Sequence, residues 1–241
     1  MAAGSAGVIG LGAFYYALSH GTMGVVAPLS ALIGAGLPVI VGLVYGETID
    51  ATRGLGMVAA LTAVVLISLP GGERTTDEKR LVRIDVHQLP FVIVAGVGFG
   101  LFFIFLSQGT MHGETWWPLV IVRLVGLAWT MLAVGLSVAR SRERSWMRRA
   151  DVVLGLPRLR ARALPVGLLV TLVLITGAGD LGGNTFFVLA ARVDALSVAV
   201  VLSSLYPVVT AILAAAFLHE RLRALQIAGV VLASLSVPLL R

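Results

Sequence analysis

Residues 198–233 read VAVVLSSLYPVVTAILAAAFLHERLRALQIAGVVLA, and residues 25–60 read VVAPLSALIGAGLPVIVGLVYGETIDATRGLGMVAA. The two stretches align without a gap, and the identical residues in register include Ser30 with Ser203, Glu47 with Glu220 and Gly56 with Gly229. Shared Val, Leu and Ala carry little weight in apolar sequence, but shared Ser, Glu and Gly carry more. In both copies a long apolar run ends at the Glu, and the Gly follows nine residues later. The chain therefore contains an internal repeat.

The composition of the whole chain is that of a lipid-soluble protein. Of its 241 residues, 58% are hydrophobic and 12% are charged, and the mean hydropathy is +0.99. A soluble domain carries about a quarter charged residues, because polar side chains must cover its surface. Since a bilayer solvates apolar side chains directly, we expect lipid to surround much of this protein.

Eight apolar segments are candidates for membrane spans, since a bilayer core about 30 Å thick needs roughly 17 to 25 apolar residues per helix. Turn residues and charges separate them, and the first and third are short. The predicted spans are residues 4–19, 22–45, 54–70, 90–107, 116–139, 165–190, 195–218 and 224–240.

The repeat relates spans one to three to spans six to eight. Because this offset of five is odd, each helix and its repeat cross the membrane in opposite directions. The predicted fold is an all-α, polytopic transmembrane bundle of about eight helices with an incomplete inverted repeat of three plus five. Residues 1–72 form the last three helices of the first repeat, 73–89 a connector, and 90–241 the five helices of the second repeat. By the same count we expect two further helices upstream of Met1.

The repeat motifs resemble a known family of membrane proteins. The second copy carries LSSLYPVVT at 202–210, LHERL at 218–222 and QIAG at 226–229, and the first carries VAPLSAL at 26–32 and YGE at 45–47. These motifs are similar to those of the drug/metabolite transporter superfamily, in particular its EamA-type permeases. The resemblance is specific over 165–241, fair over 10–70 and compositional in between. It implies ten helices in two inverted five-helix repeats, of which this chain lacks the first two, and transport of small metabolites.

Two ionisable residues lie inside predicted spans, where a charge at mid-bilayer costs at least about 2.5–3.5 kcal/mol and is a functional candidate. Arg123 and Asp180 both lie roughly 10–15 Å from the same membrane face, at about 1.5 Å per residue, so they are at suitable depths to pair. We expect them, with Asn184, to line a central cavity and to hold a zwitterionic or charged substrate. The alternative is a structural ion pair that locks two helices together.

The motif at 202–210 adds Ser203, Tyr206 and Pro207 to the predicted substrate site. Pro207 removes a helical hydrogen bond, and it either kinks its span or frees carbonyl groups toward a cavity. Glu47 and Glu220 end their spans and are interpreted as helix-end caps at the membrane interface in preference to the alternative, proton carriers.

Other chemistry finds little support in the sequence. The net charge is +6, but eight arginines lie between 140 and 162 and four further Lys or Arg between 74 and 83, all in breaks between apolar runs. That distribution is typical of membrane-flanking loops and argues against nucleic acid as a partner. There is no cysteine, and the four histidines are scattered, so we expect no metal site, no cofactor, no catalytic residues and no enzyme activity.

The sequence therefore predicts a multi-pass protein of the cell membrane that acts as a secondary transporter of small metabolites such as amino acids or drug-like compounds. The alternative is a non-transporting membrane subunit, or a truncated remnant, that packs against another chain. The expected partners are a small-molecule substrate and the lipid bilayer. A coupling ion and a homo-oligomer are left open, as are substrate identity, the direction of transport and membrane orientation. For orientation, the distribution of Lys and Arg places the termini outside the cytoplasm, whereas the family resemblance places them inside.

Overall fold

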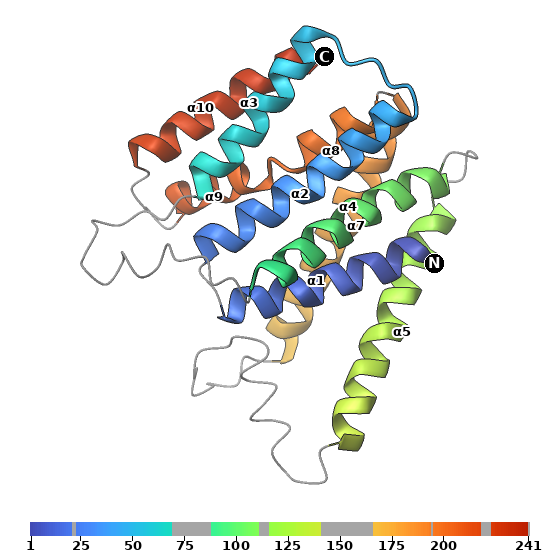
Figure 1. Cartoon of the computed structure of the whole chain (residues 1–241). Helices are drawn as coiled ribbons and strands as arrows, with labels where there is room; N and C mark the ends of the chain where they lie inside the picture. The colour runs from blue at the N-terminus through green and yellow to red at the C-terminus, as the bar shows by residue number, and fades with distance from the viewer. Residues whose placement is uncertain are drawn as a thin grey trace.

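The computed structural model describes residues 1–20, 23–68, 88–110, 116–140, 166–193, 195–217 and 223–240. All regular structure in these ranges is α-helical (Figure 1). The helices are α1 (Ala2–His20), α2 (Met23–Val44), α3 (Ala51–Ser68), α4 (Leu89–Thr110), α5 (Trp116–Arg140), α7 (Val166–Val193), α8 (Leu196–Ser203), α9 (Tyr206–Phe217) and α10 (Ala224–Leu239).

The expectation of an all-α bundle of membrane-spanning helices is confirmed in its coarse form. Within the described ranges, seven helical segments are long and apolar enough to cross a membrane, counting α8 and the first part of α9 as one. The remaining segment, α10, has 16 residues, and at about 1.5 Å per residue it falls short of a 30 Å hydrocarbon core. By length and composition these are the helices of a membrane protein.

The predicted span 195–218 is found as one apolar segment, Leu196–Leu213, but its helix is interrupted at Ser204 and Leu205. α8 ends at Ser203 and α9 begins at Tyr206. Pro207 has no N–H to give to the carbonyl of Ser203, and its ring crowds that same carbonyl. The break therefore lies where proline chemistry places it. By contrast, α2 continues through Pro28 and Pro38.

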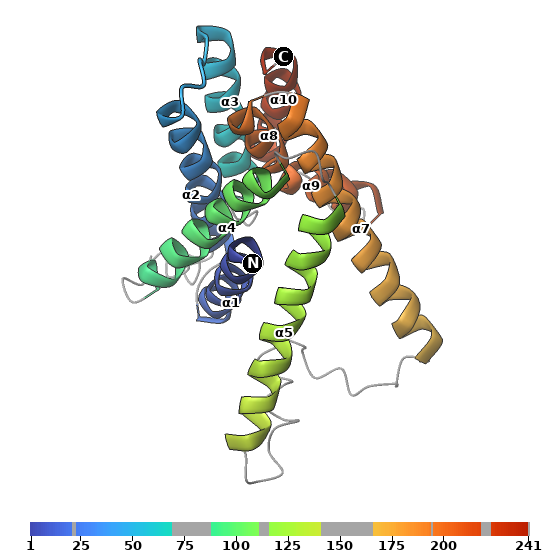
Figure 2. The same ribbon diagram turned by 90° about the vertical axis from the view of Figure 1, so that its right-hand side faces the viewer.

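Glycines set the closest approach between helices, and α4 is held by them between α1 and α2. A Cβ atom on Gly98 of α4 would lie 2.6 Å from the Cα of Gly10 in α1. On the side of α2, a Cβ on Gly96 would lie 2.9 Å from the carbonyl oxygen of Ser30. Both distances are too short for a real Cβ, so the helices meet backbone to backbone. Figures 1 and 2 show α1, α4 and α2 side by side.

A second tight pair is formed by α3 and α10, which lie side by side in both views (Figures 1 and 2). A Cβ on Gly56 would lie 3.0 Å from the Cγ of Leu240, and a Cβ on Gly229 would lie 2.6 Å from the Cγ1 of Ile67. Each glycine near the start of one helix thus meets the far end of the other. The two helices therefore run antiparallel.

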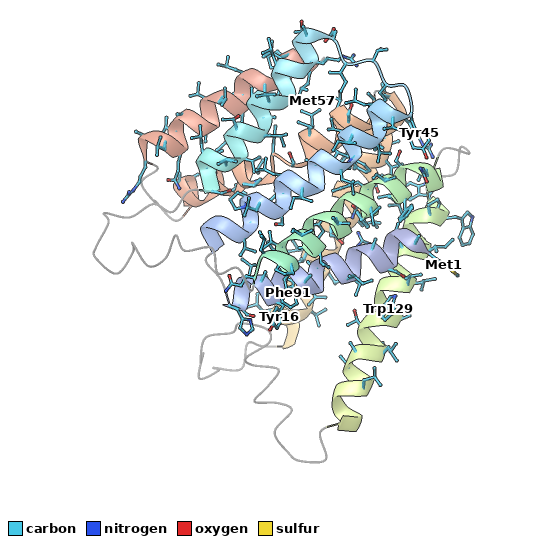
Figure 3. The ribbon with its side chains drawn as sticks, in the orientation of Figure 1. Met1, Tyr16, Tyr45, Met57, Phe91 and Trp129 are labelled. Carbon is cyan, nitrogen blue, oxygen red and sulfur yellow. The ribbon has the colours of Figure 1, made fainter. Side chains whose placement is uncertain are left out.

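α5 and α7 are covered far less than the other spans. Only 11% of the residues in each of these two spans are buried, against 39% in α4. Their ends diverge from the rest of the bundle, as Figure 2 shows. α5 is tied to α1 by the indole N–H of Trp129, which donates a 3.0 Å hydrogen bond to the hydroxyl of Ser5 (Figure 3).

Some sequence predictions fall outside the described residues. These are the arginine-rich segment beyond Arg140, most of the predicted connector 73–89, and Glu220 with its neighbours.

We predict that Gly98→Ala lowers the free energy of unfolding by about 1–3 kcal/mol, because the added methyl overpacks a backbone-to-backbone contact. Thermal or denaturant unfolding of the purified protein in detergent measures the change. Gly12→Ala is the matched control in α1, since a Cβ there has nothing within 4 Å. It should leave stability unchanged or raise it by up to about 1 kcal/mol through helix propensity. Equal effects of the two substitutions would contradict the glycine contact.

Candidate functional site

A pocket of about 340 Å³ lies among α4, α7 and α8. The residues that line it are Phe103 of α4, Asp180, Gly183, Asn184 and Phe187 of α7, and Ser203 at the end of α8. Spacings of three and four residues place the α7 members on one face of that helix. The pocket therefore combines one polar helix face with aromatic side chains, and it is open on one side rather than enclosed.

An ion pair joins α7 to α5 at this pocket. Nη1 of Arg123 lies 2.6 Å from Oδ2 of Asp180. The side-chain amide of Asn184 donates to the backbone carbonyl of Asp180 at 2.9 Å and to its Oδ1 at 3.2 Å. Each carboxylate oxygen of Asp180 thus accepts from a different side chain, which fixes the orientation of the carboxylate.

The Arg123–Asp180 pair is only partly covered by the described helices. The exposed fractions are 40% for the side chain of Arg123 and 57% for that of Asp180. In water such a pair contributes little, about 0–1 kcal/mol. In a membrane span the same two charges are costly when separated. Whether water or lipid surrounds the pair therefore decides how much it contributes to stability.

The apolar wall of the pocket is aromatic. The rings of Phe103 and Phe187 have centroids 4.6 Å apart and are tilted by 53°. Phe187 also belongs to a buried cluster with Val188 of α7 and Val200 of α8. Aromatic packing of this kind ties the polar face of α7 to the core of the bundle.

The end of α8 contributes one polar residue, Ser203, to the lining of the pocket. The hydroxyl of Ser203 donates to the carbonyl of Ala199 at 2.8 Å. Because Pro207 has no N–H, the carbonyl of Ser203 has no helical donor four residues ahead. Interrupted helices of this kind occur in membrane proteins where backbone groups line a cavity.

The structure brings four of the six predicted site residues together and separates two. Arg123, Asp180 and Asn184 form one connected group, and Ser203 lines the same pocket. Tyr206 and Pro207 begin α9 and are not among the described lining residues; Tyr206 is 55% exposed. Whether any of the six binds a substrate stays a prediction.

Sequence reasoning missed the lining residues Phe103, Gly183 and Phe187. A phenylalanine in an apolar helix gives no signal of a cavity, because most such residues pack in the core. Gly183 follows Gly179 at the four-residue spacing typical of close helix packing, yet a Cβ there has nothing within 4 Å. That open space marks the pocket instead.

The arrangement offers one positive and one negative group beside two aromatic rings. This suits a small molecule with both charges and an apolar part, or it serves only to lock α5 to α7. Within the described ranges, no three His, Asp or Glu side chains gather closely enough to hold a metal ion.

No protein-family model, curated protein or solved structure matches the chain.

We predict that Asp180→Leu destabilises the protein by about 2.5–3.5 kcal/mol, because it leaves the charge of Arg123 unpaired inside a span. The double variant Arg123→Leu with Asp180→Leu should recover most of that loss. Unfolding of the three variants in lipid nanodiscs gives the double-mutant cycle. If each single substitution lowers the free energy of unfolding by less than about 1 kcal/mol, and the two losses add in the double variant, the pair is exposed to water instead.

Proposed function

We propose that the protein is a secondary transporter of small metabolites in the cell membrane, with its substrate bound in the pocket beside Asp180. The pocket supports this proposal because it places ionisable groups within apolar spans, where their cost is tolerated for function. Amino acids and related zwitterions match the pair of charges. The family resemblance to EamA-type permeases points the same way.

Substrate binding at this pocket would exchange one ion pair for two. An ammonium group of the substrate would pair with Asp180, and a carboxylate would pair with Arg123. The unbound protein keeps the two side chains paired with each other at 2.6 Å, so neither charge is left alone between transport cycles. The aromatic rings of Phe103 and Phe187 would contact the apolar part of the substrate.

The pairing of α3 with α10 supports an inverted repeat. The offset of the sequence repeat is 173 residues, which carries Gly56 to Gly229 and Ile67 to Leu240. The contact of Gly56 with Leu240 and that of Gly229 with Ile67 therefore exchange under the repeat. A two-fold axis between the antiparallel helices produces this pattern, and such an axis in the membrane plane relates the halves of many secondary transporters.

We predict that Asp180→Asn lowers uptake by at least about tenfold, because the amide no longer pairs with a cationic group. A panel of radiolabelled L-amino acids and lipophilic amines, tested in proteoliposomes against empty vesicles, first identifies a transported compound. Asp50→Asn is the matched control: the Asp50 carboxylate accepts from the backbone N–H of Arg53 at 2.7 Å and lies away from the pocket. Unchanged uptake by Asp180→Asn at equal membrane expression would refute the assignment.

One observation favours a second candidate, a non-transporting membrane subunit. Cβ atoms at Gly179 and Gly182 of α7 would have nothing within 4 Å. Because the two glycines are three residues apart, they lie on one side of the helix, and this side offers a close-packing surface that the described residues leave open.

We predict that Gly179→Leu separates the two functions. If α7 docks a helix of another chain, the bulky side chain should dissociate the complex, as seen by size-exclusion chromatography with light scattering. If the protein transports alone, the variant should run at the parent's molecular mass and keep its uptake.

A further inference from the structure

The chain reverses direction at the end of α2, so that the carboxylate of Glu47 lies against the last turn of the helix, next to Gly42. Gly46 has φ +90°, the left-handed conformation that ends helices. The N–H of Gly46 donates a hydrogen bond to the carbonyl of Leu43 at 3.1 Å, and the N–H of Glu47 donates to the carbonyl of Gly42 at 2.9 Å. This is a Schellman motif. A Cβ on Gly42 would overlap the Glu47 carboxylate, so both glycines are needed to place it.

The Glu47 carboxylate caps a helix of the other half of the chain. Oε1 accepts from the N–H of Leu196 at 2.8 Å, and Oε2 from the N–H of Ser197 at 3.3 Å. These are the first N–H groups of α8, whose own N-cap residue, Ala195, provides no side-chain hydrogen bond. A carboxylate at this place satisfies two helical donors and interacts favourably with the helix dipole.

A second charged side chain, Arg192, makes a similar contact near the end of α7. Nη2 of Arg192, in the last turn of α7, donates to the carbonyl of Thr110 at 2.8 Å. Thr110 is the last residue of α4 and is 2% exposed. The cation thus caps the C-terminus of α4, the complement of what Glu47 does for α8.

Together the two contacts tie the adjoining ends of α7 and α8 to the ends of α2 and α4, which lie on the same side of the bundle (Figures 1 and 3). α7 and α8 are also the helices that carry Asp180, Asn184 and Ser203. At about 1.5 Å per residue, Asn184 and Ser203 lie roughly 10–15 Å along their helices from these ends. A movement of these helix ends would therefore change the geometry of the pocket.

We propose that Glu47 and Arg192 are positioning residues that clamp the adjoining ends of α7 and α8 and close the pocket on that side of the membrane. The proposal rests on the proposed transport function, since it assigns to the clamp the step in which the pocket opens to that side. Opening requires the Glu47 carboxylate to leave the N–H groups of Leu196 and Ser197. Opening would leave the carboxylate of Glu47 and the first N–H groups of α8 without these hydrogen bonds, which costs free energy. The closed state is therefore favoured until substrate binding offsets that cost.

The clamp is tested by labelling a single thiol in the pocket from each side of the membrane. The chain has no cysteine, and a Cβ on Gly183 has nothing within 4 Å, so Gly183→Cys gives a clean reporter. Tyr45→Cys, at a side chain 76% exposed at the end of α2, identifies the membrane side of the clamp. The probe is a membrane-impermeant sulfonated methanethiosulfonate, added to one side of proteoliposomes at a time.

We predict that Glu47→Ala raises the labelling rate of Gly183→Cys from the clamp side about tenfold, as loss of a charge-assisted hydrogen bond implies. Labelling from the opposite side should not rise. Glu47→Gln should fall between parent and Glu47→Ala, because its amide oxygen still accepts one N–H. Arg192→Ala should act in the same direction as Glu47→Ala.

Asp50→Ala is the matched control, because it removes a carboxylate that caps α3 within the same connector without bridging to α7 or α8. It should lower thermal stability and leave labelling from both sides unchanged. Equal labelling of parent and Glu47→Ala, or an equal rise from both sides, would overturn the clamp. A one-sided rise in a protein that transports none of the tested compounds would support the clamp and count against transport of those compounds.

Discussion

Backbone-to-backbone approach at glycines is the interaction on which the packing of α1, α2, α4, α3 and α10 depends. In lipid the hydrophobic effect gives helices no reason to associate, since hydrocarbon surrounds them in either case. Van der Waals contact remains, and it is strongest where a missing side chain lets two helices meet directly. Gly10 with Gly98, Gly96 with Ser30, and Gly56 with the end of α10 provide such contacts.

The pocket lies at the boundary between tightly and loosely packed helices. α4 contributes Phe103 from the glycine-held layer, whereas α7 contributes Asp180 and Asn184 from a helix that is mostly exposed. α7 is attached by aromatic packing at Phe187, by the ion pair to Arg123, and by the cap that Arg192 gives α4. Several of these attachments are polar contacts at single points. A helix held in this way moves more easily against the rest than one held along a continuous glycine seam.

Most of the helices could be predicted from the sequence, because lipid restricts the backbone to conformations that satisfy its own hydrogen bonds. Without water to satisfy N–H and C=O groups, an apolar run of about twenty residues must be a helix, and the predicted ranges match the observed helices within a few residues. The pairing of Arg123 with Asp180 could also be predicted from the sequence, because charges are rare inside spans.

The break at Ser204 could not be predicted, since proline in an apolar run is equally compatible with a kink. The pocket's aromatic wall depends on which faces of α4 and α7 meet, and no local pattern encodes that. Glu47 was expected to cap the end of its own span, but the helix that its carboxylate caps lies about 150 residues further along the chain.

The interruption between α8 and α9 has no counterpart in α2, the helix that aligns with them in sequence. Under the repeat offset, Pro207 corresponds to Gly34, which lies inside the unbroken α2 and against α4, where a Cβ would stand 3.3 Å from that of Phe99. At this level α2 is one continuous helix, whereas α8 and α9 are separate helices. The glycine at 34 goes with the continuous helix and the proline at 207 with the break, so only the second of the two aligned stretches has a joint at which two helices can change their angle.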